Sequence, residues 1–164
     1  MRMLLRVTMV GFAATLVASP VVGQRADSQI NPRSAELLRQ GEAHLAAGRF
    51  NEADDALETA LAVDPRNRAA FVVLARVASK QKLYGQAIRF TNRALALEPN
   101  DLDALAVQGE AMVELGAVAR AQQNLVKLQR LCPSGCGQLS SLSAAISRGQ
   151  TVAAATRVPQ TKSN

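Results

Sequence analysis

Residues 68–101 read RAAFVVLARVASKQKLYGQAIRFTNRALALEPND, and the proline near the end of this stretch recurs at a fixed distance on both sides. Pro65, Pro99 and Pro133 are spaced 34 residues apart. A period of this length is typical of arrays of helical hairpins, in which each repeat buries its apolar face against its neighbours. The stretch therefore predicts a repeat protein whose central unit spans residues 68–101.

Other positions recur with the same period. Small residues stand 12 and 24 positions before each proline, where two helices would have to approach closely: Ala53, Ala87 and Ala121, and Gly41, Ala75 and Gly109. Larger residues stand 28 and 15 positions before it and would fill the remaining space: Leu37, Phe71 and Leu105, and Phe50, Tyr84 and Val118. This spacing predicts two antiparallel helices in each repeat.

The pattern resembles the tetratricopeptide repeat, in three consecutive copies over residues 34–67, 68–101 and 102–135. The resemblance implies an all-α fold, a right-handed superhelical array of three helical hairpins. Gln40, Gln108 and Thr91 stand where the family usually has bulkier apolar residues. We expect these three to change local packing without changing the fold.

Shorter segments flank the repeats. Residues 24–33 are mostly polar and predict a flexible lead-in, so that Ser34 starts the first helix. Leu139, Leu142 and Ile146 continue the apolar spacing and predict a helix over residues 136–148 that seals the open end of the array. Residues 149–164 show no periodicity and are expected to be disordered.

The composition agrees with this assignment. A chain of 164 residues with 48% hydrophobic residues can bury one sizeable core but hardly two. Only 3% of the residues are aromatic and none is Trp, so Leu, Val and Ala must supply the core volume. These residues suit closely packed helices better than a β-sandwich or barrel.

The first 23 residues have the layout of a secretory signal peptide. Arg2 and Arg6 precede an apolar run over residues 7–18, and Gly23 provides a small residue for cleavage. The alternative is a retained membrane anchor, but only 18 uncharged residues separate Arg6 from Arg25, against about 20 needed to cross a bilayer. We expect a mature chain that begins near Gln24 and has no membrane span.

The expected destination is the bacterial periplasm, because short arrays of this family that are rich in Ala and Arg resemble bacterial ones. Secretion from the cell is the alternative. Removal of the two leader arginines leaves 17 basic and 13 acidic residues, a net charge of +4. The basic residues of the second repeat are flanked by acidic ones rather than forming a continuous stripe with stacking aromatics, which argues against nucleic acid as a partner.

Cys132 and Cys136 are the only cysteines, and they lie between the third repeat and the sealing helix. An oxidising compartment favours a disulfide between them, while a pair of free thiols is the alternative. Three residues separate them, whereas redox and haem motifs need two. The single His44 is distant in sequence, so we expect no metal site.

The sequence contains no recognisable constellation of catalytic residues. It has no nucleophile elbow, no phosphate-binding glycine loop and no pair of metal-binding histidines. We therefore expect no enzymatic activity, no cofactor and no small-molecule substrate.

The resemblance to tetratricopeptide repeats implies a non-enzymatic adaptor or scaffold, which binds a peptide or partner helix in a groove lined by the first helix of each hairpin. The residues expected to face this groove are Leu38, Glu42, Leu45, Val72, Arg76, Lys80, Asp103, Ala106, Glu110 and Glu114. They give a basic centre between acidic ends, with Leu38 and Val72 as an apolar stripe. An alternative is that these charges pair with one another and keep the groove soluble.

Family members that clamp a terminal carboxylate have Lys and Asn at the positions of Leu38, Glu42 and Asp103, so that activity is not implied here. A partner with an acidic centre and basic flanks fits better. An alternative function is that of a structural or assembly subunit of an envelope complex, which would associate through its outer faces.

Overall fold

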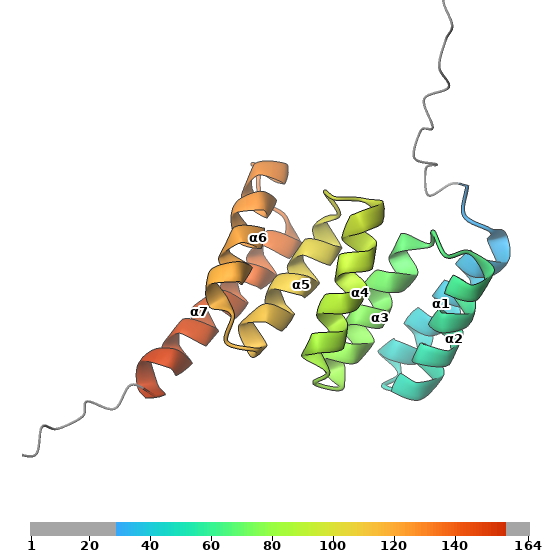
Figure 1. Cartoon of the computed structure of the whole chain (residues 1–164), viewed down its shortest axis with the longest axis horizontal. Coiled ribbons are helices and arrows are strands. Elements are labelled where there is room, and N and C mark those ends of the chain that lie inside the picture. The colour runs from blue at the N-terminus through green and yellow to red at the C-terminus, as the bar shows by residue number, and fades with distance from the viewer. Residues whose placement is uncertain (1–28, 157–164) are drawn as a thin grey trace, which may run out of the picture.

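The computed structural model describes residues 29–156, so the predicted signal peptide and residues 24–28 of the lead-in lie outside the described residues. Residues 29–156 form seven helices and no strand, which confirms the predicted all-α fold. The helices are α1 (Pro32–Ala46), α2 (Phe50–Val63), α3 (Arg68–Lys80), α4 (Tyr84–Leu97), α5 (Leu102–Glu114), α6 (Val118–Leu131) and α7 (Gly137–Thr156). They follow one another in an elongated row (Figure 1).

Helix α1 begins at Pro32, two residues earlier than predicted. Proline suits the first helical position, where its missing N–H has no partner to lose. Asn31 caps the helix, since its side chain accepts from the Arg33 N–H at 2.8 Å. The Asn31 N–H in turn donates to Asp64 at 3.1 Å, which ties the start of the array to the end of its first hairpin.

Asn67 caps helix α3. Its side-chain oxygen accepts from the N–H of Ala70 at 3.2 Å at the start of α3. Asp101 holds the same repeat position and caps α5 through the N–H of Ala104 at 2.6 Å. Asp101 also forms a mostly buried ion pair with Arg68, which joins the starts of α3 and α5.

A three-residue turn joins the two helices of each hairpin, and its middle residue is left-handed. Gly48 and Gly116 adopt φ angles of 72° and 75°, which glycine allows without steric penalty. The second hairpin has Lys82 at this position, with φ 61°. The fold thus imposes an unfavourable backbone conformation on a residue with a β-carbon.

The first helices of the hairpins form the inner layer of the array. Helix α1 contacts α3, and α3 contacts α5, whereas α2, α4 and α6 make no contacts among themselves. The second helices are therefore spread apart on the outer side, and the row bends around the first helices. The most deeply buried large side chains, Leu57, Leu74, Leu128 and Leu142, pack at the interfaces between helices.

Two glycines within the repeats allow close helix contacts. A β-carbon on Gly41 would lie 2.5 Å from the nearest atom of Leu57, and one on Gly109 would lie 2.6 Å from Leu142. The first contact joins α1 to α2, and the second joins α5 to α7. Both positions are predicted small residues, so the repeat pattern specifies where the backbones approach.

The departures from the family pattern at Gln108 and Thr91 compensate each other. Gln108 is 5% exposed, and its amide donates to Asn92 at 2.7 Å and to the Thr91 hydroxyl at 3.3 Å. Asn124 donates to the Gln108 side-chain oxygen at 3.0 Å. This network links α4, α5 and α6, and it satisfies polar groups whose burial would otherwise be unfavourable.

Helix α7 packs against α5 and α6 through Leu142 and Ile146, in the place predicted for a sealing helix. It extends to Thr156 rather than ending at 148, so the prediction of disorder from residue 149 is wrong for residues 149–156. Gly149 explains part of the extension. It lies against Val113 so closely that a β-carbon would be 2.6 Å away, which keeps the helix on α5 beyond the predicted end.

Replacing Gly109 by Ala should destabilise the protein, because the added β-carbon must displace the buried Leu142. Overpacking of this kind costs about 1–3 kcal/mol. Gly85→Ala is the matched control, since nothing lies within 4 Å of its β-carbon position and helical alanine is favoured by about 0.5–1 kcal/mol. Urea unfolding measures both, and equal stability of the two variants would show that Leu142 moves aside without strain.

Candidate functional site

The inner face is formed by α1, α3 and α5 and is extended by α7. Of the residues predicted to line it, Glu42, Arg76, Lys80 and Glu114 are exposed. Asp103 and Glu110 are partly exposed on α5. The charged members of the predicted set are therefore all accessible, on three successive first helices.

The predicted apolar stripe is not available for docking. Val72 is only 4% exposed, because it packs against Ala94 and Ala104 of the next two helices. Leu38 and Leu45 are partly buried against the core of the first hairpin. Val72 is thus a packing residue rather than a groove residue, and the inner face presents mainly polar groups.

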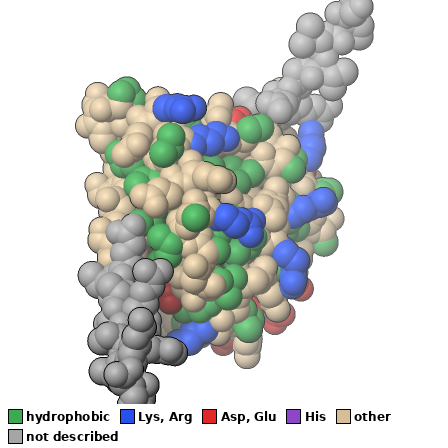
Figure 2. Space-filling view, turned by 60° about the vertical axis from the view of Figure 1, so that its left-hand side comes forward, with side chains coloured by type: hydrophobic (Ala, Val, Ile, Leu, Met, Phe, Trp, Pro, Cys, Tyr) green, Lys and Arg blue, Asp and Glu red, His purple; other side chains and the backbone are tan. Residues whose placement is uncertain are grey.

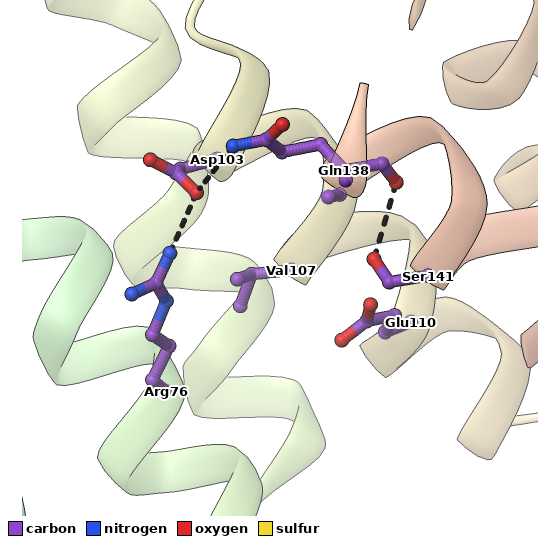
Figure 3. A pocket seen from close by; sticks show the side chains of 8 residues that line it. Arg76, Asp103, Val107, Glu110, Gln138 and Ser141 are labelled. Carbon is purple, nitrogen blue, oxygen red and sulfur yellow. Dashed lines mark hydrogen bonds and ion pairs between the residues drawn. The ribbon is translucent and has the colours of Figure 1, made fainter. Parts of the chain in front are cut away.

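The structure brings Arg76, Asp103, Ala106 and Glu110 together around a hollow of about 230 Å³ between α3, α5 and α7 (Figure 3). Ala106 is buried and contributes to the lining, with Val107 beside it. The remaining lining residues come from α7: Gly137, Gln138 and Ser141. The sealing helix is therefore one wall of the hollow.

An ion pair crosses this hollow. The Arg76 guanidinium lies 2.6 Å from an Asp103 carboxylate oxygen, and the Gln138 amide donates to the same oxygen at 3.2 Å (Figure 3). The expected alternative, pairing of groove charges, therefore holds for Arg76 and Asp103. Both side chains are nearly half exposed, so the pair contributes under about 1 kcal/mol and can open for a ligand.

A second hollow of about 230 Å³ lies further along the same face, where Lys80 and Tyr84 face Glu110 and Glu114. Ala145 and Arg148 of α7 complete its lining. Partial burial raises the pKa of Tyr84 above its ordinary value, and the charge of Glu114 and its hydrogen bond with the tyrosine raise it further. The phenol thus stays protonated and able to donate a hydrogen bond.

A third hollow of about 440 Å³ lies between the α5–α6 turn and α7, lined by Val113, Val118, Ala145 and Gly149 among others. Helix α7 thus contributes to all three hollows. Sequence reasoning missed Gln138, Ser141 and Arg148, since it gave this helix only the role of sealing the array. The 34-residue period could have indicated this role, because α7 occupies the position of the first helix of a fourth hairpin, and first helices line the inner face.

The two cysteines lie at the corner between α6 and α7. Their sulfurs are at bonding distance and their Cα atoms are 6.0 Å apart, within the range of disulfides. Cys132 holds the repeat position of Asp64 and Glu98, which accept backbone hydrogen bonds at their own corners. The third corner keeps the backbone hydrogen bond of the turn, from the Gly135 N–H to the Cys132 oxygen, and has a covalent link where the others have a side-chain hydrogen bond.

Residues 29–156 include no cluster of three or more His, Cys, Asp or Glu side chains suited to a metal ion. Within the same range, none of the helices has the length and apolar character that a membrane crossing requires. His44 accepts a hydrogen bond from the Arg49 side chain at 3.0 Å. This contact ties it to the turn after α1.

These features define a helical-repeat array with a polar inner face. A family model described as tetratricopeptide repeat matches residues 44–110, and no curated protein sequence matches the chain. The match runs from the end of α1 into α5, so this part of the chain contains tetratricopeptide repeats, and the three hairpins together have the fold of such an array.

Solved structures share the fold. The Sgt2 TPR domain from Aspergillus fumigatus superposes with a TM-score of 0.70 at 18% identity, over 82% of this chain and 88% of that one. The first TPR of Spaghetti (RPAP3) bound to the HSP90 peptide SRMEEVD gives 0.66 at 22% identity, over 73% and 96%. The second TPR domain of human RPAP3 with the HSP70 peptide SGPTIEEVD gives 0.62 at 21% identity, over 71% and 98%.

Tyr84 is the only tyrosine of the chain, so its ionisation can be read directly from ultraviolet absorbance. We expect its pKa to lie above 10.0, and Glu114→Gln to lower it by removing the neighbouring negative charge. Burial remains in the variant, so the pKa should not fall below the ordinary value. An unchanged pKa of Tyr84 in Glu114→Gln would show that burial alone raises it.

Replacing Cys132 and Cys136 by Ser should lower the free energy of unfolding by about 2 kcal/mol or less, since the closed loop is short. The loss should be local, because the link holds only the corner of α6 and α7. Amide hydrogen exchange is expected to accelerate in α7 while α1–α4 keep their protection. Equal acceleration in all helices would contradict this assignment.

Proposed function

We propose that this protein is an interaction module that binds a peptide or partner helix on its inner face. The observation that carries the proposal is the row of hollows between α3, α5 and α7, lined by exposed charged side chains with few apolar ones. Such a surface recognises a partner by charge and hydrogen bonding. The two RPAP3 domains named above bind HSP90 and HSP70 peptides, which supports the same general use here.

The partner should differ in chemistry from those peptides, both of which end in EEVD. On the inner face Lys80 lines the second hollow together with Glu110 and Glu114, while Arg76 is paired with Asp103. We propose a segment with an acidic group for Lys80 and basic groups on both sides. A basic flank would be attracted by the glutamates, whereas an acidic one would be repelled.

The role we propose is that of a non-enzymatic adaptor or scaffold. The inner face offers carboxylates, amides and a hydroxyl, but no arrangement of nucleophile and general base was recognised in the sequence. The alternative, an assembly subunit that associates through its outer face, predicts a stable homo-oligomer. Size-exclusion chromatography at low concentration separates the two, since an adaptor should elute as a monomer.

Reversing two inner-face charges, Arg76→Glu with Lys80→Glu, should reduce recovery of the partner in a pull-down and change its salt dependence. The matched control is Arg33→Glu with Arg39→Glu, which makes the same charge change on α1 outside the predicted groove set. Tyr84 fluorescence provides a second readout, because this residue lines the second hollow. If both double variants bind like the unmodified protein, the inner face is not the binding site.

We further propose that the protein is exported, with the bacterial periplasm as its destination. The support is the layout of residues 1–23 together with a cysteine pair placed for a disulfide, which an oxidising compartment would maintain. Sequencing of the N-terminus of the abundant cellular form should find a chain that begins near Gln24. A chain that still carries Arg2 and Arg6 would contradict cleavage.

A further inference from the structure

The outer face carries charge that changes sign along the array. The second helices carry charged residues on their outer side, and these are acidic on α2 but basic on α4 and α6. The acidic ones are Glu52, Asp55 and Glu58; the basic ones are Arg89 and Arg93 on α4, and Arg120, Lys127 and Arg130 on α6. Two of these charges reverse at matching repeat positions: Asp55 on α2 corresponds to Arg89 on α4, and Glu52 corresponds to Arg120 on α6.

The two basic helices themselves contain no acidic residue. No Asp or Glu occurs in the sequence after Glu114. Figure 2 turns the C-terminal side of the array toward the viewer, and this face shows Lys and Arg side chains in several places with few acidic side chains in view. Charges of one sign gathered in this way create an extended positive potential.

These cations are not used to hold the fold together. Arg89, Arg93, Arg120 and Arg130 are exposed and make no ion pair or hydrogen bond with the part of the chain that the structure describes. Lys127 donates to the backbone oxygen of Pro99 at 2.5 Å and keeps its charge uncompensated. Positive charges that pair with no acidic group of the fold are available to an anionic partner.

Apolar side chains are exposed among the cations. Val126 is 43% exposed on α6, and Leu131 is 37% exposed at its end, next to Arg130. Aliphatic groups beside Lys and Arg suit the boundary between headgroups and acyl chains of a bilayer, where both kinds of contact are satisfied. No aromatic side chain accompanies the exposed residues of α4 and α6 that form this surface, so it lacks the stacking platform of single-stranded nucleic-acid sites.

We propose that the outer face of α4 and α6 docks on anionic lipid headgroups. The hollows described above lie on the inner face and against α7, whereas these cations spread over two outer helices. That arrangement fits a continuous layer of negative charge better than a single acidic peptide, which would need a groove. The acidic α2 is repelled by the same layer, so the array tilts with α4 and α6 on the lipid and the inner face open.

Sedimentation with vesicles tests this surface. The purified protein should bind vesicles of phosphatidylcholine and phosphatidylglycerol in equal parts more strongly than phosphatidylcholine alone, and added salt should remove the difference. Binding through residues 1–23, which include Arg2 and Arg6, is the same in every variant, so the comparison between variants isolates the contribution of α6. Arg120→Gln with Arg130→Gln should weaken partition into the anionic vesicles by roughly 10- to 30-fold.

Arg33→Gln with Arg39→Gln is the matched control, which removes the same charge from α1 and should leave partition within about twofold. Circular dichroism checks that both variants keep their helix content. Equal binding to both vesicle types, or equal loss in both variants, would overturn the proposal. So would failure to bind anionic vesicles while soluble polyglutamate binds, since that result would indicate an acidic protein partner.

Discussion

The structure depends on close contact between helices that cannot fold alone. Each hairpin buries its apolar side only when a neighbour covers it, and the contact is made where a side chain of one helix fits against the backbone of another. Leu57 lies against Gly41 in this way, and Leu142 lies against Gly109. The 34-residue period repeats this constraint along the chain, so the array is held by a series of equivalent interfaces rather than by one central core.

The sequence predicts this part of the structure well, because interface positions demand particular sizes at particular spacings. Gly41, Ala53 and Ala121 are small for a physical reason that any stacked hairpin shares, and Asn67 caps α3 as its position predicts. The end of α7 was not predictable in the same way. Residues 149–156 carry no apolar repeat, and the contact that extends the helix at Gly149 depends on Val113 in a different hairpin.

The site was harder to predict than the fold. Periodicity identifies which residues lie on a first helix, but it does not say whether a given one faces the open side or the next repeat. Val72 and Arg76 differ by one turn of α3, and only the structure shows that the first is covered by α4 and α5 while the second reaches Asp103. The contribution of α7 depends on its angle to α5, which no local pattern specifies.

Helix α7 both covers the end of the array and forms a wall of its inner face. This double role affects how such a protein can evolve. Leu142 and Ile146 are constrained by the core, while Gln138 and Ser141 on the same helix line a hollow. A helix that slides or rotates to accept a new core residue also reshapes that hollow. Changes in partner preference can therefore arise from substitutions that touch no ligand, and a terminal element gained for stability becomes the place where specificity diverges.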